Sequence, residues 1–398
     1  MSEPAAAAPL AARLCRVALI AGEASGDQLG ASLIAALRGR HPGVEFIGMT
    51  GPRMRAAGCQ SLADIEELSV MGLVEVLRHY PRLRALRGRL SQTLLAARPD
   101  VIVGIDVPDF SLQIEEDLKR AGALAVHYVC PQVWAWRAGR LPRIARAVDL
   151  VLTLFPFEAP FLAAHGIAAA FVGHPLADKI PAVANRQACR AALGLSAAGP
   201  LVALMPGSRR QELRHHVDLF LLAAQRLLAR HPSAQFVSGA IGPAAAAQLR
   251  ERQASLVPQL PLTIIEGRAS EMLQAADVAL LVSGTVTLEA ALSGTPSVVA
   301  YRLAPLSYWW LRRLVKVPHI ALPNLLLERR WFPEFIQAQA SPETLAEALS
   351  GWLSNPEAVA QCRAACGGLH AALRQDAGLA AAQAIERALL ARAAGHPP

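Results

Sequence analysis

Arg16-Val-Ala-Leu-Ile-Ala-Gly-Glu-Ala-Ser-Gly-Asp27 begins with an apolar run of strand length and continues directly into a glycine-bounded turn. The residues that follow, 29–38, have a helical pattern. A short, continuously apolar strand that leads through a tight turn into a helix is typical of a parallel sheet with helices on both faces. The stretch therefore predicts the start of a doubly wound α/β domain.

The same strand-and-helix unit recurs along most of the chain. Strands are expected at residues 101–105, 125–129 and 150–154, and a second series at 201–205, 235–238, 262–265, 278–282 and 297–300. The pattern weakens between Gly173 and Pro200, so we predict a first domain over residues 1–180 and a second over 181–398 that includes the C-terminal helices. Ser341-Pro342-Glu343 is a helix-start signal in this last part. Ligands bind at the carboxyl ends of such strands, so two α/β domains facing one cleft are predicted.

Composition and charge limit the partners. The 398 residues are 53% hydrophobic, which excludes disorder for most of the chain. Lys and Arg number 39 against 31 Asp and Glu, a net charge of +8, and this surplus favours nucleic acid, a phosphorylated ligand or a membrane surface. No zinc finger or aromatic RNA-binding signature is present, so no nucleic acid partner is predicted.

The six cysteines form no CxxC pair and indicate free thiols in a reducing compartment. Cys362, Cys366 and His370 share a helical stripe, but a metal there would lack a fourth ligand, so buried small side chains are the simpler interpretation. No secretory signal or membrane-spanning stretch is expected. The mean hydropathy of +0.31 is nevertheless high, which favours one-sided contact with a membrane.

Three turns at predicted strand ends carry candidate binding chemistry. Gly22 to Asp27 allows close backbone approach, and the next helix start offers free amides to an anion, but the spacing is not that of a dinucleotide site. A purely structural turn is the alternative there. Pro206-Gly-Ser208-Arg209 supplies a guanidinium for phosphate oxygens, unless Arg209 only pairs with Glu212.

The third turn is Ser283-Gly284-Thr285, whose hydroxyl groups could cap the next helix while its amides face a diphosphate. Glu289, one turn further on among apolar residues, is placed to bind ribose hydroxyls, since an unpaired buried carboxylate is costly.

A candidate general base ends another strand. Asp106 follows the strand at 101–105 and has no evident structural role. Asp109 is the second candidate, although helix N-capping would also explain it. His127, His174 and His319 are further possibilities, but a lone histidine is more often structural.

Six stretches then occur in a characteristic order. They are Gly22-Glu-Ala-Ser-Gly-Asp27, Gly104-Ile-Asp-Val-Pro-Asp-Phe110, Pro131-Gln-Val-Trp-Ala-Trp-Arg137, Pro206-Gly-Ser-Arg209, Ser283-Gly-Thr285 and Leu322-Pro-Asn-Leu-Leu326. Together they resemble the family of lipid-A-disaccharide synthases, from about Arg16 to the final helices. Cys130, Gln132, Val107 and Ser111 depart from the pattern, but none of these changes removes a proposed functional side chain.

The resemblance implies a GT-B fold and an inverting transfer. UDP-2,3-diacylglucosamine would donate its sugar to 2,3-diacylglucosamine 1-phosphate (lipid X), giving a β-1,6-linked disaccharide 1-phosphate and UDP. Asp106 would deprotonate the acceptor 6-hydroxyl. The residues that would bind the nucleotide are Ser208, Arg209, Ser283, Gly284, Thr285, Glu289 and Asn324. Those that would bind substrate are Glu23, Ser25, Gly26, Asp27, Trp134 and Arg137. No Asp-x-Asp pair is evident, so neither a metal nor another cofactor is expected.

Two alternatives remain open: an isomerase like the UDP-N-acetylglucosamine 2-epimerases, and a non-catalytic UDP-lipid binding protein. The resemblance also implies an enzyme in the cytoplasm that binds peripherally to the inner membrane of a Gram-negative bacterium, and we expect a monomer or a homodimer. Val70, Leu73, Val74 and Leu77 form an apolar stripe beside Arg78 and later arginines, which predicts an interfacial helix interrupted at Pro81. A core-facing helix with a solvated basic side is the alternative.

Overall fold

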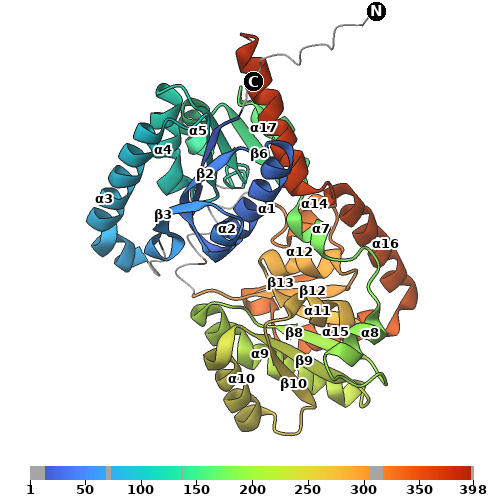
Figure 1. Ribbon diagram of the computed structural model, residues 1–398. Helices are drawn as coiled ribbons and strands as arrows, with labels where there is room; N and C mark the ends of the chain where they lie inside the picture. Colours follow the sequence, from blue (N-terminus) through green and yellow to red (C-terminus); the bar gives the residue numbers. More distant parts are fainter. Residues whose placement is uncertain (1–13, 69–72, 136–137, 305–307, 309–316, 396–398) are drawn as a thin grey trace, which may run out of the picture. The chain divides into compact units, whose positions relative to one another are not determined.

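The computed structural model describes residues 14–68, 73–135, 138–304, 308 and 317–395, without the side chains of residues 73–80. The described chain divides into two compact units (Figure 1). One comprises the residues up to Pro175 together with those from Leu373 onward, and the other comprises Leu176–Ala372. Each unit is an α/β structure with its own parallel sheet, so the predicted fold class is confirmed for both.

The first unit contains a seven-stranded parallel sheet in the order β3-β2-β1-β4-β5-β6-β7. Its strands are β1 (Arg16–Ala21), β2 (Glu45–Thr50), β3 (Gln60–Asp64), β4 (Val101–Ile105), β5 (Leu124–Tyr128), β6 (Leu150–Thr153) and β7 (Ala169–Phe171). The chain first adds strands on one side of β1 and then crosses to β4 on the other side. This reversal puts the ends of β1 and β4 side by side, where doubly wound sheets bind ligands.

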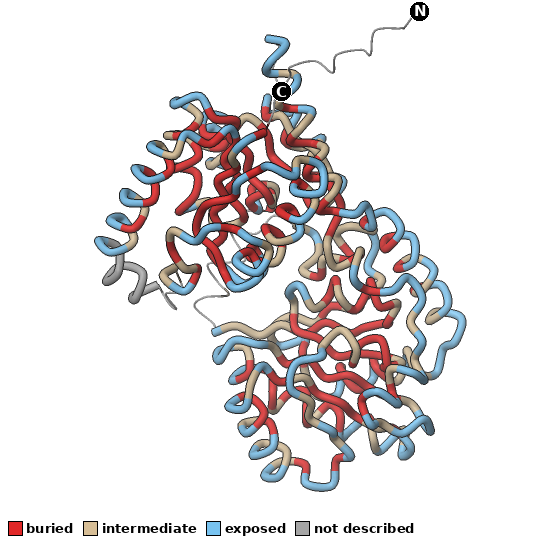
Figure 2. Tube along the Cα trace, viewed as in Figure 1, coloured by how far each residue is buried: buried red, intermediate tan, exposed pale blue. Residues whose placement is uncertain are grey.

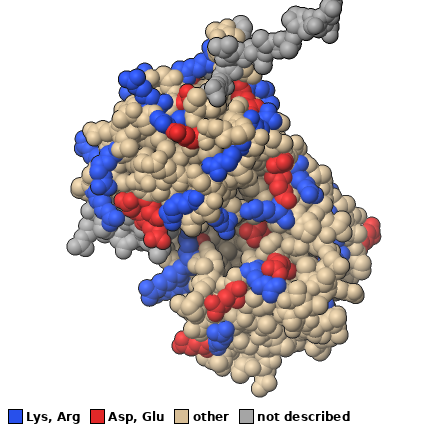
Figure 3. Space-filling view, in the orientation of Figure 1, with Lys and Arg blue, Asp and Glu red and all other residues tan. Residues whose placement is uncertain are grey.

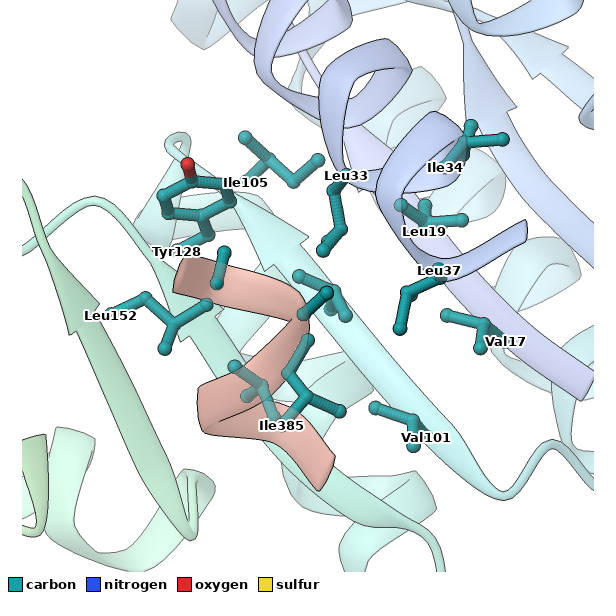
Figure 4. Close-up of a cluster of buried hydrophobic side chains, with 14 of the residues drawn as sticks. Val17, Leu19, Leu33, Ile34, Leu37, Val101, Ile105, Tyr128, Leu152 and Ile385 are labelled. Atoms are coloured by element: carbon teal, nitrogen blue, oxygen red, sulfur yellow. The ribbon is translucent and has the colours of Figure 1, made fainter. Parts of the chain in front are cut away.

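Helices cover both faces of this sheet. Val17 and Leu19 of β1 pack with α1 (Ala24–Arg40) and α17 (Ala377–Ala393) (Figure 4). Ala18 and Ile20 point to the opposite face and pack with α3 (Leu73–Ala97) and α4 (Pro108–Arg120). Alternate residues of one strand are therefore buried on different faces, which explains why the strand is apolar throughout. The remaining helices are α2 (Pro52–Ala56), α5 (Leu141–Ala147) and α6 (Glu158–Ala163), with 3₁₀ turns η1 (Ile65–Leu68) and η2 (Ala138–Arg140).

The last helix, α17, belongs to the first unit, which differs from the predicted division at residues 180 and 181. It lies beside α1 (Figure 1), and its Ile385 is fully buried in the core of the first sheet. Glu386 accepts hydrogen bonds from Arg40 at 2.6 Å and contacts His41 at 2.9 Å. A helical pattern shows that a helix has an apolar face, but it does not show which sheet that face covers.

The second unit contains a six-stranded parallel sheet in the order β10-β9-β8-β11-β12-β13. Its strands are β8 (Leu201–Met205), β9 (Gln235–Ala240), β10 (Leu262–Glu266), β11 (Val278–Val282), β12 (Ser297–Tyr301) and β13 (Glu334–Ile336). Helices α9 (Arg210–Arg230), α10 (Gly242–Leu256) and α15 (Pro342–Ser354) bury one face. The other helices are α7 (Pro175–Lys179), α8 (Arg186–Ala192), α11 (Ala269–Ala275), α12 (Thr285–Leu292), α14 (Leu322–Leu326) and α16 (Pro356–Leu373), with a 3₁₀ turn η3 (Gln337–Gln339). Buried residues follow the strands of both units in Figure 2.

Helix α3 continues through Pro81, although an interruption was predicted there. Proline removes one amide donor from the helix but does not have to end it. Of the helices that the structure describes, none is long and apolar enough to cross a membrane.

Candidate functional site

The candidate nucleotide site lies in the second unit, at the carboxyl ends of its central strands. Strands β8 and β11 are neighbours, with Met205 paired to Leu281, and the order of strands reverses between them. A cavity of about 370 Å³ opens at this point. Six of the seven predicted nucleotide-binding residues line it: Ser208, Arg209, Ser283, Gly284, Thr285 and Glu289.

The turn after β8 presents a flexible cation to this cavity. Gly207 has φ +115°, and a Cβ there would lie 2.5 Å from the Cβ of Glu212. The backbone amides of Ser208 and Arg209 donate to Glu212 Oε2 at 2.9 and 3.2 Å. The side chain of Arg209 is 83% exposed and only 3.8 Å from Glu212. This weak, exposed ion pair leaves the guanidinium available to an anionic ligand.

Helix α12 begins at the cavity wall without a capping side chain. Gly284 is its N-cap residue, so the predicted capping by Ser283 and Thr285 is wrong. The Ser283 hydroxyl instead donates to the carbonyl of Ile320 at 2.7 Å. Because no side chain caps the helix, its first amides remain available to a phosphate group, and Thr285 is exposed beside them.

Glu289 is the cavity's half-buried carboxylate. Burial raises its pKa above the usual range. Within the described part of the chain, no residue forms an ion pair or a side-chain hydrogen bond with it. A desolvated carboxylate without a protein partner is costly unless a ligand supplies hydrogen-bond donors.

Asn324, the seventh predicted nucleotide contact, has a structural position instead. It is fully buried and does not line the cavity. Its amide donates to the carbonyl of Phe332 at 2.7 Å and to Glu334 at 2.8 Å, and its oxygen accepts from the Phe332 amide at 2.8 Å. These contacts use both N–H groups of the side chain, which joins α14 to β13 and does not line the cavity.

Several cavity residues were not found from the sequence. Gly239 and Ala240 are the last two residues of β9, Ile241 follows them, and Gly267 follows β10. Both strands were predicted, so the rule that ligands bind at strand ends would have located them. Tyr301, at the end of β12, also lines the cavity and stacks on His216 at 5.8 Å.

The first unit offers a second candidate centre, where β1 and β4 end side by side. Ala21 pairs with Ile105, and a Cβ on Gly22 would lie 2.4 Å from Val107. Asp106 and Val107 both have left-handed backbone conformations, with φ +55° and +50°. The Asp106 amide donates to Tyr128 O at 2.9 Å, and its half-buried carboxylate accepts from the Val107 amide at 3.1 Å. Strained non-glycine backbone of this kind is found mostly at functional sites.

Asp109 lies next to this centre. It had been expected to be the N-cap of α4, but it is not. Val107 holds that position, and Asp109 lies in the first turn. Its carboxylate is 69% exposed and accepts from Arg140 at 2.7 and 2.9 Å. An exposed, paired carboxylate is a weaker base candidate than Asp106.

The predicted substrate residues of the first turn separate into two groups. Glu23 and Ser25 are exposed at the start of α1, and Gly26 is buried, with its Cβ position 3.3 Å from the carbonyl of Ile105. Asp27, by contrast, is 1% exposed and accepts from the amides of Gly51, Arg53 and Met54, each at 2.9 Å. It caps α2, so the predicted substrate contact of Asp27 is wrong.

Trp134 is half-buried beside an unusual carboxyl group, whereas Arg137 lies outside the described residues. The indole donates to Glu158 at 3.0 Å and meets Phe157 edge to face at 5.0 Å. Burial raises the pKa of Glu158 to about 7, opposed by the amides of Phe155 and Leu154 and by the indole.

The three candidate histidines have structural surroundings. His127 is fully buried and contacts Glu115 at 2.9 Å, and burial lowers the pKa of His174 to about 4. His319 lies 3.9 Å from the buried Glu334. In the ranges that the structure describes, no group of three or more His, Cys, Asp or Glu side chains could hold a metal ion.

Both units are doubly wound, and the second presents an arginine, free helix amides and an unpaired carboxylate at its strand ends. This combination is that of a two-domain nucleotide-sugar enzyme of GT-B fold. The chain belongs to the lipid-A-disaccharide synthetase family, whose model matches residues 17–388. It is 52% identical over 370 residues to lipid-A-disaccharide synthase of Pseudomonas aeruginosa (strain UCBPP-PA14), covering 93% of this chain and 97% of the relative. The enzyme of the same name from Azotobacter vinelandii is 51% identical over 375 residues, covering 94% and 98%.

Solved structures share the fold at low sequence identity. A glycotransferase of kitacinnamycin matches with a TM-score of 0.62 at 17% identity, covering 94% of this chain and 99% of that one. UDP-GlcNAc 2-epimerase from Neisseria meningitidis, bound to UDP-GlcNAc, matches with a TM-score of 0.60 at 12% identity, covering 95% and 100%. Identities this low show a common fold and do not separate transfer from epimerisation.

Proposed function

We propose that this chain condenses UDP-2,3-diacylglucosamine with 2,3-diacylglucosamine 1-phosphate to give the β-1,6-linked disaccharide 1-phosphate and UDP. Family membership over nearly the whole chain supports a glycosyltransferase of lipid A biosynthesis. The observation that carries the proposal is the cavity at the ends of β8 and β11, where the unpaired Glu289 faces the same space as Arg209 and the start of α12.

The second unit would hold the donor. Arg209 and the first amides of α12 bind the diphosphate, and Glu289 accepts hydrogen bonds from the ribose hydroxyls. As the bond from the anomeric carbon to the diphosphate oxygen breaks, negative charge develops on UDP. A guanidinium and helix amides already in place stabilise that charge.

The first unit would activate the acceptor. Asp106 accepts the proton of the acceptor 6-hydroxyl while its oxygen attacks the anomeric carbon from the face opposite UDP. One carbon–oxygen bond forms, one breaks, and the configuration inverts. Glu23, Ser25 and Gly26 at the start of α1 lie near enough in sequence and strand register to contribute to this substrate's site. Trp134, which follows β5 of the same sheet and is half-buried, is a further candidate contact for this substrate.

Because both substrates carry acyl chains, we further propose that the enzyme acts at the cytoplasmic face of the inner membrane. Leu73, Val74, Leu77 and Arg78 lie in α3, although their side chains are outside the description, and Val70 lies outside the described residues. Farther along α3, Arg82, Arg84 and Arg89 are exposed, and Figure 3 shows basic side chains along this side of the first unit. Each such charge adds about 1 kcal/mol of attraction to an anionic surface.

A mass spectrum of the products tests the proposed reaction. The purified protein is incubated with both lipid substrates, and the reaction is followed by UDP release and by the mass of the lipid product. A disaccharide 1-phosphate formed with one UDP per turnover supports the transfer. An isomerised nucleotide sugar would instead make the protein an epimerase, and binding without any product would leave only a lipid-binding role.

A further inference from the structure

A buried pair of polar side chains lies in the first unit, where α4 packs against β4 and β5. Nδ1 of His127, in β5, lies 2.9 Å from Oε1 of Glu115, in α4, and both side chains are completely buried. The proposed reaction gives neither residue a role. Removing one member of such a pair is costly, but replacing both by apolar residues is often neutral or stabilising. Stability alone therefore does not explain why the pair is present.

Glu115 reaches β4 at a glycine. A Cβ on Gly104 would lie 1.6 Å from Oε1 of Glu115, so the carboxyl group occupies the space of the missing side chain. Gly104 is paired with His127 in the register of the sheet. Ile102 and Ala125, two positions earlier on the same two strands, pack in the core with residues of α4, and side chains two positions apart share a face. Glu115 therefore joins α4 to both strands at the level of Gly104.

The hydrogen bonding of this cluster is incomplete. Oε2 of Glu115, Nε2 of His127 and the hydroxyl of Ser111 are buried and have no hydrogen-bond partner among the described residues. Ser111 belongs to the same place, because its Cβ lies 2.9 Å from the Cβ position of Gly104. Buried polar atoms without partners lower stability. Proteins retain such local violations mainly at functional positions, so the cluster indicates a function.

The turn that carries Asp106 is built on this junction. The Asp106 amide donates to the carbonyl of Tyr128, the residue after His127, at 2.9 Å. The Ser111 amide donates to the carbonyl of Val107 at 3.0 Å. Asp106 and Val107 both have left-handed backbone, and strained conformations of this kind persist only where the surrounding structure fixes them.

We propose that Glu115, through its contact with His127, is a positioning residue that holds the carboxylate of Asp106 in place for proton transfer. The inference rests on the proposed function, in which Asp106 is the base. Glu115 is completely buried, so it acts through the turn and not on the substrate. Misplacing a reacting group by about 1 Å can slow a reaction about 100-fold. A purely structural pair would instead affect folding and leave the turnover of the folded enzyme unchanged.

Steady-state kinetics of the full chain test this role. Glu115→Leu removes the contact and should lower kcat by a factor of about 10 to 100, with the KM of both substrates and the affinity for UDP unchanged. Glu115→Gln preserves the shape and can still form a hydrogen bond with His127, so its kcat should stay near that of wild type. The double variant Asp106→Asn with Glu115→Leu should be no slower than Asp106→Asn alone. A residue that acts through Asp106 has no further effect once the base is removed.

Asp149→Asn is the matched control. Asp149 lies 3.0 Å from Lys119 of α4 and accepts from the amide of Ala125 at 2.9 Å. It therefore also ties α4 to the sheet, but at the amino ends of the strands, and its loss should leave kcat unchanged. Circular dichroism checks that each variant folds. If Glu115→Leu does not fold, the double variant Glu115→Leu with His127→Leu replaces it, because apolar replacement of both members is often neutral for stability.

The outcomes separate this role from the proposed reaction. Normal turnover in the folded Glu115→Leu variant, together with slow turnover in Asp106→Asn, would overturn the positioning role and leave the proposed transfer intact. Equal slowing in Asp149→Asn, or a further loss in the double variant beyond Asp106→Asn, would overturn it as well. Normal turnover in Asp106→Asn would remove the group through which Glu115 acts and refute this inference alone. A wild-type chain that forms no disaccharide and releases no UDP would refute the proposed function and this inference with it.

Discussion

Asp106 directly follows β4, one of the two strands at the topological switch of the first sheet, and its backbone at φ +55° is held in a conformation that few non-glycine residues adopt. Replacing it by Asn preserves the shape and removes the base. Turnover should fall by a factor of about 100 to 10,000, while the affinity for UDP should not change, because we propose that the second unit binds the nucleotide. Steady-state kinetics and UDP titration measure the two. Near-normal turnover in a folded Asp106→Asn enzyme would show that another group is the base, and Asp109 is the next candidate.

Arg209 and Glu289 should affect nucleotide binding in different ways. Arg209→Ala removes a charge-assisted phosphate contact worth about 1.5 to 3 kcal/mol, so both UDP and pyrophosphate should bind more weakly. Glu289→Ala should weaken the binding of UDP and leave the binding of pyrophosphate unchanged, because its proposed partner is the ribose. Arg214→Ala provides the control, since Arg214 is exposed on α9 and does not line the cavity. Unchanged UDP affinity in both Arg209→Ala and Glu289→Ala would mean that the nucleotide binds elsewhere.

Glu158 should make the stability of the protein depend on pH. Its folded-state pKa, about 7, lies above the ordinary value of 4.5, so the folded state binds this proton more tightly. The stabilisation that this proton gives the folded state is complete below pH 4.5 and is lost as the pH rises to about 7. The free energy of unfolding should therefore decrease by up to about 3 kcal/mol over this range. His174, with a folded-state pKa lowered to about 4, acts in the opposite direction. Urea denaturation of wild type and of Glu158→Gln therefore measures the difference between their free energies of unfolding as the pH changes. A difference that does not depend on pH would contradict the prediction.

At the scale of elements, local signals located nine of the thirteen described strands and missed β2, β3, β7 and β13, and of the predicted helix caps only that of α15 is correct. Ser341 accepts from the Thr344 amide at 3.2 Å and caps α15 as predicted. The runs at Val101–Ile105 and Val278–Val282 are strands with the predicted bounds. By contrast, β7 and β13 have three residues each, too few for any hydrophobic period to show.

Residues whose role depends on a distant partner were the ones misassigned. Asp27 lies in a motif that looks like a ligand-binding turn, but its three donors are amides of the loop and helix after β2. The partners of Asn324, Phe332 and Glu334, are closer in sequence. They contact it only because the chain turns back after α14 and continues into β13. In both cases tertiary structure determined the hydrogen bonds, and no local pattern could show them.

Helix α17 provides an element-scale prediction. Ile385 is fully buried against the first sheet, whereas Leu390 on the same helix is 46% exposed. Ile385→Ala should lower the free energy of unfolding by about 2 to 5 kcal/mol, and Leu390→Ala by about 0.5 kcal/mol or less. Chemical denaturation of the full chain measures both changes. Equal effects would mean that α17 does not complete the core of the first unit.

For the whole molecule, two parallel sheets and a cavity at the predicted strand ends of the second unit followed from periodicity and strand-end chemistry. The assignment of the last helix did not follow, because the chain leaves the first unit at Pro175 and returns to it at Leu373. An excursion of this length is invisible to local patterns. The basic charge was equally ambiguous from the sequence, since a surplus of +8 suits both a phosphorylated ligand and an anionic membrane.

The membrane proposal is tested by replacing Val70, Leu73, Val74 and Leu77 together by Ser. If this stripe contacts lipid, the variant should remain folded and bind anionic vesicles less in a flotation assay, because apolar area is lost from the interface. Leu86→Ser is the matched control: Leu86 lies in the same helix, is 2% exposed and belongs to the core beneath it. That change should destabilise the first unit by several kcal/mol. If the fourfold variant unfolds as Leu86→Ser does, the stripe packs in the core, and if flotation is unchanged, the membrane contact lies elsewhere.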